Sequence, residues 1–166
     1  MAEGRVTYAQ EDRWHVLRYV GRVDYTLAPA IDRFVQSLFA DGGVRPFLFD
    51  VREARVLDST NLGLLARIAE RVRAADGGRS TIVSTDDDIN DVLTSMGFIE
   101  IFDIMPELPY KTRVDCEEMV TGDPPSHGEL LRTMLDAHRT LVTLNDRDRQ
   151  RFQDVVTMLE AEIRTR

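Results

Sequence analysis

The stretch PFLFDVREARVLDSTNLGLLARIAERV, residues 46–72, is the part of the chain around which the rest can be arranged. Its first part, Phe47-Leu48-Phe49-Asp50-Val51, is an almost continuous apolar run, which is typical of a strand covered on both faces. A connection at residues 55–57 leads to residues 58–61, which favour helix caps and tight turns. Apolar residues then recur at helical spacing up to residue 72. The stretch therefore predicts a strand, a tight turn and a helix.

Ser59 stands at the turn between this strand and this helix. The first backbone N–H groups of a helix lack partners within the helix, and its positive end favours an added anion. Ser59 is therefore a candidate for phosphorylation. The simpler alternative is that Asp58 or Ser59 only caps the helix, a role that contributes about 1 kcal/mol. Taken alone, residues 58–61 favour the cap.

The composition indicates an ordinary globular protein. The chain has 166 residues, of which 43% are hydrophobic and 30% charged, so it resembles neither a disordered tail nor a membrane protein. Its formal net charge of −8 lacks the basic excess that nucleic-acid binding requires. No apolar run is long enough to span a bilayer, and residues 1–5 lack a signal-peptide core. We therefore expect a cytoplasmic protein.

Residues that usually hold metal ions or form disulfides are sparse. Cys116 is the single cysteine, so an internal disulfide is excluded. His15, His127 and His138 are widely separated and show no metal-ligand spacing. Residues 86–88 are all aspartate, but the glycine and distal glutamate of a calcium loop are absent, and helix capping explains them better. We expect no metal and no cofactor.

Strands and helices alternate on both sides of the central stretch. An antiparallel hairpin and a helix are expected before it, and a strand, a helix and a short edge strand after it. Helices between parallel strands require right-handed crossovers, so the prediction is an α/β fold: a mixed β-sheet with α-helices packed on one side or both. The strands are expected near residues 6–9, 14–21, 81–83 and 99–104, and the helices near residues 26–41 and 87–96.

The last third of the chain differs in character from the first two thirds. Residues 106–125 are punctuated by proline and glycine and are predicted to be an irregular linker. Two amphipathic helices follow, the second starting at Asn145, and a helical hairpin is their simplest arrangement. Its apolar stripes are expected to pack on the domain or on each other rather than to form a docking groove. We therefore divide the chain into a domain at 1–105, the linker, and a hairpin at 126–166.

The chain contains three motifs, at residues 21–24, 58–63 and 92–98, and in this order they resemble the STAS domain of the anti-sigma factor antagonists. Gly21-Arg22-Val23-Asp24 stands where the second strand of that family ends. Asp58-Ser59-Thr60-Asn61-Leu62-Gly63 stands where the family has Asp-Ser-(Ser/Thr)-Gly-Leu-Gly at the start of its second helix. The run from Val92 to Phe98 is similar to the third helix of the family and its glycine stop. The resemblance covers residues 5–105 and implies a STAS-like mixed sheet.

This resemblance implies a phosphorylation switch without enzyme activity or catalytic residues. In the family, the unphosphorylated domain binds a GHKL-type protein that is both anti-sigma factor and serine kinase, and the sigma factor is released. Phosphorylation breaks that contact, and a PP2C-like phosphatase restores it. The resemblance implies that Ser59 is the phosphorylated residue and that the switch and partner-binding surface comprises Asp24, Asp58, Thr60, Asn61, Leu62 and Gly63. From the sequence alone, Gly63 is more easily explained by close packing.

Two features depart from the family pattern. Asn61 replaces the usual glycine, which asparagine can partly imitate because it tolerates positive φ. The residues after Ile104 have no counterpart in a minimal antagonist. An alternative function is therefore a STAS scaffold that recruits another signalling protein or oligomerises through residues 126–166. A small hydrolase that pairs Ser59 with a nearby histidine is a weaker third alternative.

A phosphate on Ser59 is expected to act mainly at an interface. Phosphoserine carries a charge of about −2. A partner carboxylate about 5 Å away would oppose it by roughly 2 to 7 kcal/mol, for effective dielectric constants between about 80 and 20. The start of the helix would favour the same charge by only about 0.3 to 2 kcal/mol. The phosphate should therefore release a partner and leave the fold intact, provided that a kinase can reach the hydroxyl.

Overall fold

The computed structural model describes residues 3–111 and 118–165, and within these ranges six strands form one mixed sheet. Their order across the sheet is β5-β4-β3-β2-β1-β6. Strands β2, β3, β4 and β5 are parallel neighbours, while β1 pairs antiparallel with both β2 and β6. The strands are β1 (Arg5–Glu11), β2 (Trp14–Val23), β3 (Phe47–Leu57), β4 (Ser80–Val83), β5 (Phe102–Met105) and β6 (Glu118–Met119).

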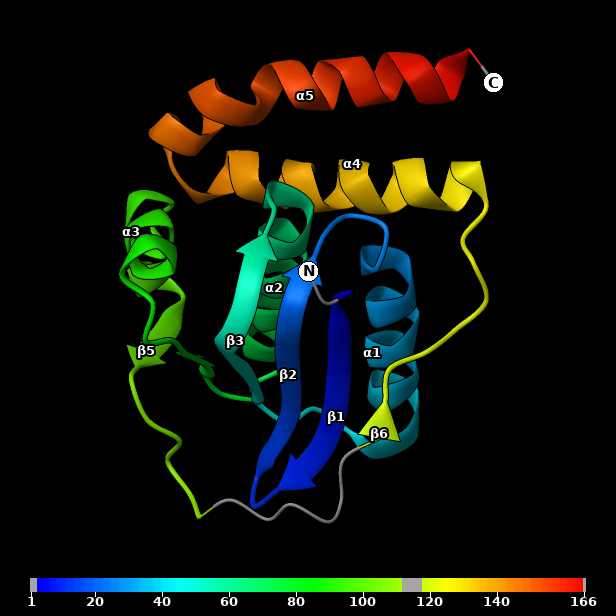
Figure 1. Ribbon diagram of the computed structural model, residues 1–166. Coiled ribbons are helices and arrows are strands. Elements are labelled where there is room, and N and C mark those ends of the chain that lie inside the picture. Colours follow the sequence, from blue (N-terminus) through cyan, green and yellow to red (C-terminus); the bar gives the residue numbers. More distant parts are fainter. Residues whose placement is uncertain (1–2, 112–117, 166) are drawn as a thin grey trace.

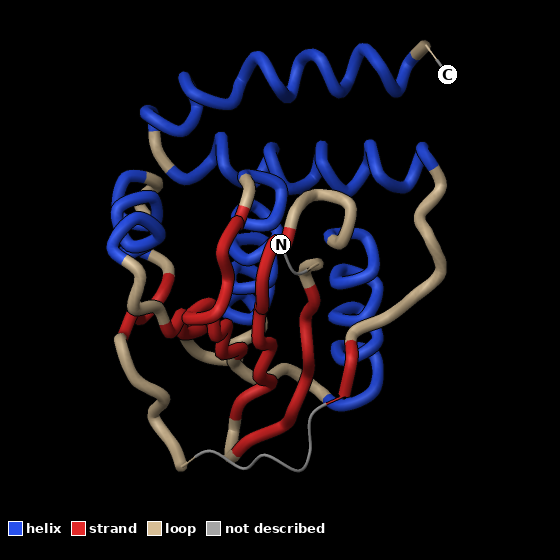
Figure 2. Tube along the Cα trace, in the orientation of Figure 1, coloured by secondary structure: helices blue, strands red, loops and turns tan. Residues whose placement is uncertain are grey.

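Helices α1 and α2 cover one face of this sheet, and Figure 2 shows them behind the strands. Helix α3 and a short 3₁₀ turn, η1, follow β4. Helices α4 and α5 form an antiparallel hairpin that lies across the end of the domain at which β3 passes into α2 (Figure 1). The helical elements are α1 (Ala28–Gly42), α2 (Ser59–Ala74), α3 (Asp87–Ser95), η1 (Phe98–Glu100), α4 (His127–Leu144) and α5 (Asp146–Arg164).

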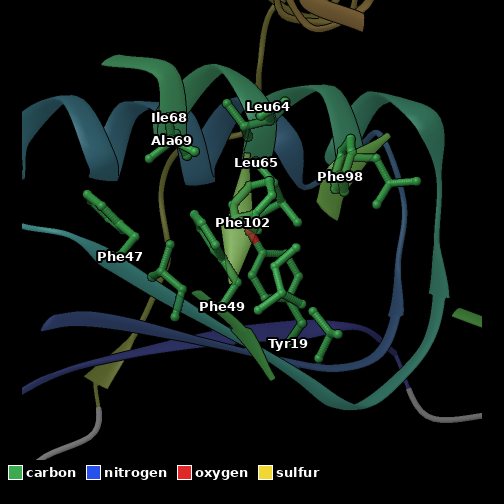
Figure 3. Packing of buried hydrophobic residues seen from close by; sticks show 14 of the residues in the cluster. Tyr19, Phe47, Phe49, Leu64, Leu65, Ile68, Ala69, Phe98 and Phe102 are labelled. Atoms are coloured by element: carbon green, nitrogen blue, oxygen red, sulfur yellow. The ribbon is translucent and has the colours of Figure 1, made fainter. Parts of the chain in front are cut away.

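The main core lies between the sheet and the helices. Phe47 and Phe49 of β3 and Tyr19 of β2 point from the sheet toward α2 (Figure 3). The rings of Phe47 and Phe49 are stacked with their centroids 5.8 Å apart. The residues of α2 that meet them are fully or almost fully buried, and burial of each large side chain contributes roughly 1.5 to 3 kcal/mol. They are Leu64, Leu65, Ile68 and Ala69.

On the opposite face of the sheet, the irregular segment after β5 packs against β2 and β3. Leu48 of β3 is fully buried there, together with Trp14 and Val16 of β2. Leu108 and Tyr110 pack against them from the segment after β5. Side chains that alternate along β3 are thus buried on both faces. This explains the continuous apolar run at the start of that strand.

The predicted α/β fold with a STAS-like mixed sheet and a C-terminal helical hairpin is confirmed. Two elements, β3 and β6, differ from the sequence prediction. Residues 55–57, expected to be a connection, belong to β3, because the strand continues to pair with β2 as far as Leu57 opposite Val23. Strand β6 lies in the stretch expected to be irregular, where Met119 pairs with Thr7 of β1.

The hairpin packs in both of the ways that its apolar stripes predicted. A core of its own joins α4 and α5, and Leu141 of α4 is fully buried in the main core of the domain. Asn145 ends α4 and caps α5, since its side-chain oxygen accepts from the backbone N–H of Asp148 at 2.8 Å. No helix in the described part of the chain is long and apolar enough to cross a membrane. The residues of the hairpin core are Leu131, Leu135, Val156 and Leu159.

Candidate functional site

Helix α2 begins directly after Asp58, and Asp58 is its N-cap. The carboxylate of Asp58 accepts a hydrogen bond from the backbone N–H of Asn61 at 3.0 Å, while its own backbone is extended. This is the usual capping geometry, so the capping role considered for Asp58 or Ser59 belongs to Asp58. Ser59 is the first helical residue, and its hydroxyl is therefore left for another partner.

Asn61 joins the start of α2 to the end of β2. It is fully buried, and its side-chain amide donates to the backbone oxygen of Val23 at 3.2 Å and to the carboxylate of Asp58 at 2.9 Å. In the described ranges, the residues with positive φ other than glycine are Asp12 and Asp76. The suggestion that Asn61 imitates a positive-φ glycine is therefore wrong. It acts through its amide, inside the first turn of the helix.

Asp24 follows Val23 in the loop before α1 and is held in a fixed turn. Its carboxylate accepts hydrogen bonds from the hydroxyl and the backbone N–H of Thr26. The Thr26 hydroxyl is the main cause that lowers the pKa of Asp24, and Arg22, 3.7 Å away, adds to the effect. The carboxylate of Asp24 is therefore negatively charged at neutral pH, and it stays charged to a lower pH than an ordinary aspartate does.

The Ser59 hydroxyl contacts His138 of α4. Its oxygen lies 2.8 Å from Nε2 of His138, and Nδ1 of the same ring lies 2.7 Å from the backbone oxygen of Met134. A carbonyl oxygen can only accept, so Nδ1 carries a hydrogen, and in the neutral ring Nε2 is the acceptor. Ser59 thus donates to His138. The histidine is 3% exposed, and its ring packs edge-on against Phe152 of α5.

The other residues that the resemblance assigned to the partner surface lie under α4 or inside α2. Thr60 and Leu62 are each 3% exposed, and Gly63 is buried. A methyl group on Gly63 would lie 2.3 Å from the backbone oxygen of Ala137, too close for any real contact. The glycine therefore serves close packing, which lets the α4 backbone rest directly on α2. Ser59 itself is half-buried at this contact between helices, not on an open surface.

The pairing of Ser59 with His138 has the hydrogen bond of a nucleophile and its base, but it lacks other features of a hydrolase site. The second ring nitrogen of His138 binds a backbone carbonyl of its own helix and not a carboxylate. Three hollows formed by described residues, near residues 119–125, 90–104 and 132–163, contain neither Ser59 nor His138. The arrangement favours a closed helix contact over a substrate cleft.

His138 is the one residue of this site that the sequence did not single out for it. The histidine stands 79 positions after Ser59, within an apolar stripe of α4, and no spacing links the two. A weak signal existed, since a histidine on an apolar stripe needs a hydrogen-bonding partner when buried. Only the packing of α4 on α2 reveals which partner it has.

Comparison with known proteins gives the family. Residues 5–112 match the family model of the STAS domain, in agreement with the resemblance seen in the sequence. A similar solved structure is described as an anti-sigma factor antagonist from Mycobacterium paratuberculosis, with 21% identity and a TM-score of 0.55. The match covers 64% of this chain and 88% of that chain, and it supports the fold. None of the curated proteins matches this chain. Because the family model spans well over half of the sequence, the chain belongs to the STAS domain family.

Proposed function

We propose that this protein is a cytoplasmic, non-enzymatic anti-sigma factor antagonist that is switched by phosphorylation of Ser59. The unphosphorylated STAS domain binds an anti-sigma factor that is also a GHKL-type serine kinase, and the sigma factor is released. Phosphorylation ends this contact, and a PP2C-like phosphatase restores it. The observation that carries the proposal is the position of the Ser59 hydroxyl, which follows the capping residue Asp58 at the first position of α2 in a STAS domain.

The chemistry at this position supports a switch that acts on binding. Because Asp58 caps α2, modification of Ser59 removes no capping bond from the helix. The free N–H groups of the first turn favour a phosphate, whereas the carboxylates of Asp58 and Asp24 oppose it nearby. These effects on the fold have opposite signs, so the charge of the phosphate is felt mainly by a partner that faces it.

The proposed switch and partner surface is the first turn of α2 with the loop beside it. Leu62 and Gly63 lie one turn after Ser59 and would supply apolar and backbone contacts. Asn61 fixes this turn against β2 through its bond to Val23, so the loop that carries Asp24 adjoins the turn. The proposed surface comprises Asp24, Asp58, Thr60, Asn61, Leu62 and Gly63.

The proposal is tested with purified GHKL-type anti-sigma kinases of the source organism and magnesium ATP. We expect one of them to phosphorylate the wild-type protein and the Ser37→Ala variant, whose replaced serine is exposed on α1, but not Ser59→Ala. Ser59→Asp should weaken binding to that kinase by about tenfold or more, measured by calorimetry, and Ser37→Ala should leave it unchanged. Phosphorylation of Ser59→Ala, or equal affinity for all variants, would reject the proposal.

A second function, a STAS scaffold that assembles through its C-terminal helices, is favoured by one observation. Met158 of α5 is 71% exposed, whereas Leu131, Leu135, Val156 and Leu159 pack inside the hairpin. If this residue mediates assembly, light scattering should show a dimer that Met158→Glu converts to a monomer. The leading proposal expects no such change of mass.

A hydrolase that uses Ser59 is tested separately. A fluorophosphonate probe labels serines that a base has activated. We expect no labelling of Ser59, with Ser59→Ala as the control. Labelling that is lost in this variant and in His138→Phe would favour catalysis.

A further inference from the structure

We propose that α4 and α5, residues 127–164, form a movable cap that closes over Ser59. In the closed state seen here, the cap occupies the surface of α2 on which phosphorylation and partner binding would take place. The inference rests on the proposed function for the meaning of Ser59, and it adds a state in which the switch is masked by the protein's own chain.

The first support is that the contact between Ser59 and His138 cannot form when Ser59 carries a phosphate. The Ser59 oxygen and Nε2 of His138 are 2.8 Å apart, which is the length of a direct hydrogen bond. No phosphorus and three further oxygens fit between these atoms. Once esterified, the Ser59 oxygen also has no hydrogen to donate, so the bond to His138 is lost. A phosphate on Ser59 therefore breaks this contact and brings a bulky dianion to the place where α4 meets α2.

The second support is the contact one turn further along α2. The backbone of α4 rests on Gly63, so closely that a single methyl group would collide with Ala137. Leu62, beside it, is buried. A partner that contacts Leu62 or Gly63 therefore needs the space that α4 holds. Binding of the partner and closure of the cap compete for one surface.

The third support is that the cap can move as a unit. Its two helices share a core of their own, which would keep them together away from the domain. Several of its attachments to the domain are polar and partly exposed: Glu129 to Arg33 at 3.0 Å, and Asp136 to Arg67 at 3.9 Å. Exposed ion pairs of this kind contribute little to stability. The apolar contacts that hold the cap closed are Leu141, which is buried in the main core, and Leu144 and Phe152, which pack against it.

The fourth support is the extent of the family match. The STAS model ends at residue 112, so the cap lies outside the part of the chain that matches the family. It is an addition placed over the first turn of α2, which the family motif occupies.

Closure and phosphorylation are linked in both directions. If closure of the cap disfavours the phosphorylated form of Ser59 at equilibrium by some factor, then the phosphate disfavours the closed cap by the same factor. In the unphosphorylated protein, the apparent affinity for a partner is the affinity of the open state multiplied by the fraction of molecules that are open. The protein that binds is therefore both unphosphorylated and open.

A cysteine on the covered side of α4 measures the cap without any partner. Thr133 is buried and lies four residues before Ala137, on the same side of the helix. In the full chain with Cys116→Ser and Thr133→Cys, we expect slow reaction with Ellman's reagent. Phosphoserine incorporated at position 59 during translation should accelerate the reaction by about tenfold or more, because it opens the cap.

Two further variants of the chain with Thr133→Cys complete the test, and each replaces one alanine with glutamate. Ala137→Glu places a carboxylate against Gly63 and should accelerate labelling by a similar factor, whereas Ala161→Glu, on an exposed site of α5, should not. Circular dichroism shows whether Ala137→Glu remains folded, and if it does not, the phosphoserine protein decides alone. Labelling of the parent as fast as in urea, or no acceleration by phosphoserine, would overturn the cap.

The two proposals fail in different ways. The labelling experiment contains neither a kinase nor an anti-sigma factor. If phosphoserine opens the cap but no kinase modifies Ser59, the proposed function is rejected and the cap remains. If a kinase binds and modifies Ser59 but phosphoserine leaves labelling slow, the cap is rejected and the function remains.

Discussion

Ser59 and His138 illustrate how one hydroxyl can serve two states of a molecule. Because Asp58 caps α2, the Ser59 hydroxyl contributes nothing to the helix itself and is free to hold α4. The same atom is the proposed site of phosphorylation. Phosphorylation of Ser59 would therefore act on the hairpin through the loss of its hydrogen bond to His138.

This bond should be measurable by a double-mutant cycle. His138→Phe removes the acceptor but keeps a ring against Phe152, and Ser59→Ala removes the donor. We expect a coupling of about 0.5 to 1.5 kcal/mol in the free energy of unfolding, measured with urea, because His138 is buried and Ser59 is half-buried. Effects of the two substitutions that simply add would show that the bond does not form in solution.

His15 is a second buried histidine, and it makes the stability depend on pH. Its Nδ1 lies 2.7 Å from the hydroxyl of Tyr8, and Nε2 has no partner in the described chain. Burial is the main cause that lowers the pKa of His15 from 6.5, and Arg45 lowers it further. The unfolded chain therefore takes up a proton on this residue at a higher pH than the folded one. The folded state loses stability as the pH falls through about 6.5.

The loss should be smaller in a variant that cannot take up this proton. We expect His15→Phe to reduce the drop in the free energy of unfolding between about pH 7.5 and about pH 5.5. His127→Phe, which replaces an exposed histidine at the start of α4, is the matched control. Equal drops in the two variants would contradict the assignment to His15.

Helix α2 contributes side chains to the main core and also forms the candidate site. Gly63 lies in this helix, where it contacts the backbone of α4. In the interior of an ordinary helix, glycine is less favourable than alanine by about 1 kcal/mol. Here the side chain is excluded because the α4 backbone takes its place. The cost in helix propensity is offset by the close approach of the two helices.

Two glycine-to-alanine substitutions should therefore change the free energy of unfolding in opposite directions. Gly63→Ala is expected to lower the free energy of unfolding by about 1 to 3 kcal/mol, since the methyl group forces α4 away. Gly128→Ala, in the first turn of α4 with open space around it, should raise it by up to about 1 kcal/mol. Urea titrations decide the signs. Stabilisation by both substitutions would mean that α4 does not rest on Gly63 in solution.

The elements differ in how well the sequence could predict them. The buried half of β3 was predictable because Phe47 to Val51 are apolar, whereas its second half carries exposed Arg52, Glu53 and Arg55 and resembled a connection. Only pairing with β2 extends the strand to Leu57. Strand β6 was missed because its two exposed residues lie near prolines and become a strand only by pairing with β1.

The candidate site was predictable from local sequence and unpredictable where it depends on distant packing. The turn at Asp58 and Ser59 follows from four cap-forming residues between a strand and a helix. That His138 would meet Ser59 depends on how α4 crosses α2, which no periodicity encodes. The amphipathic stripes predicted that the hairpin would be packed against something. They did not indicate that it would cover the very surface assigned to a partner.

The whole molecule consists of a domain and a hairpin that adds a core of its own to the main one. Each of the two parts contains a buried ionisable group, and the two groups make stability depend on pH in opposite directions. His15 lies in the sheet, and its pKa is lowered, so acid weakens the domain. Asp148 lies in the first turn of α5 with 0% of its surface exposed, and one of its carboxylate oxygens has no partner in the described chain. Burial is the main cause that raises the pKa of Asp148, which Arg151 partly opposes.

A raised pKa means that the folded state binds the proton of Asp148 more tightly than the unfolded state does. The charged carboxylate therefore destabilises the fold at neutral pH, and this cost disappears as the pH falls through the raised pKa. We expect Asp148→Asn to be more stable than the wild type at about pH 7.5, with an advantage that has shrunk at about pH 4, near the ordinary pKa of an aspartate, measured by urea unfolding. Asp146→Asn, whose carboxylate is 94% exposed, should show no such trend. If the advantage of Asp148→Asn were the same at both pH values, the buried charge of Asp148 would not be what destabilises the hairpin.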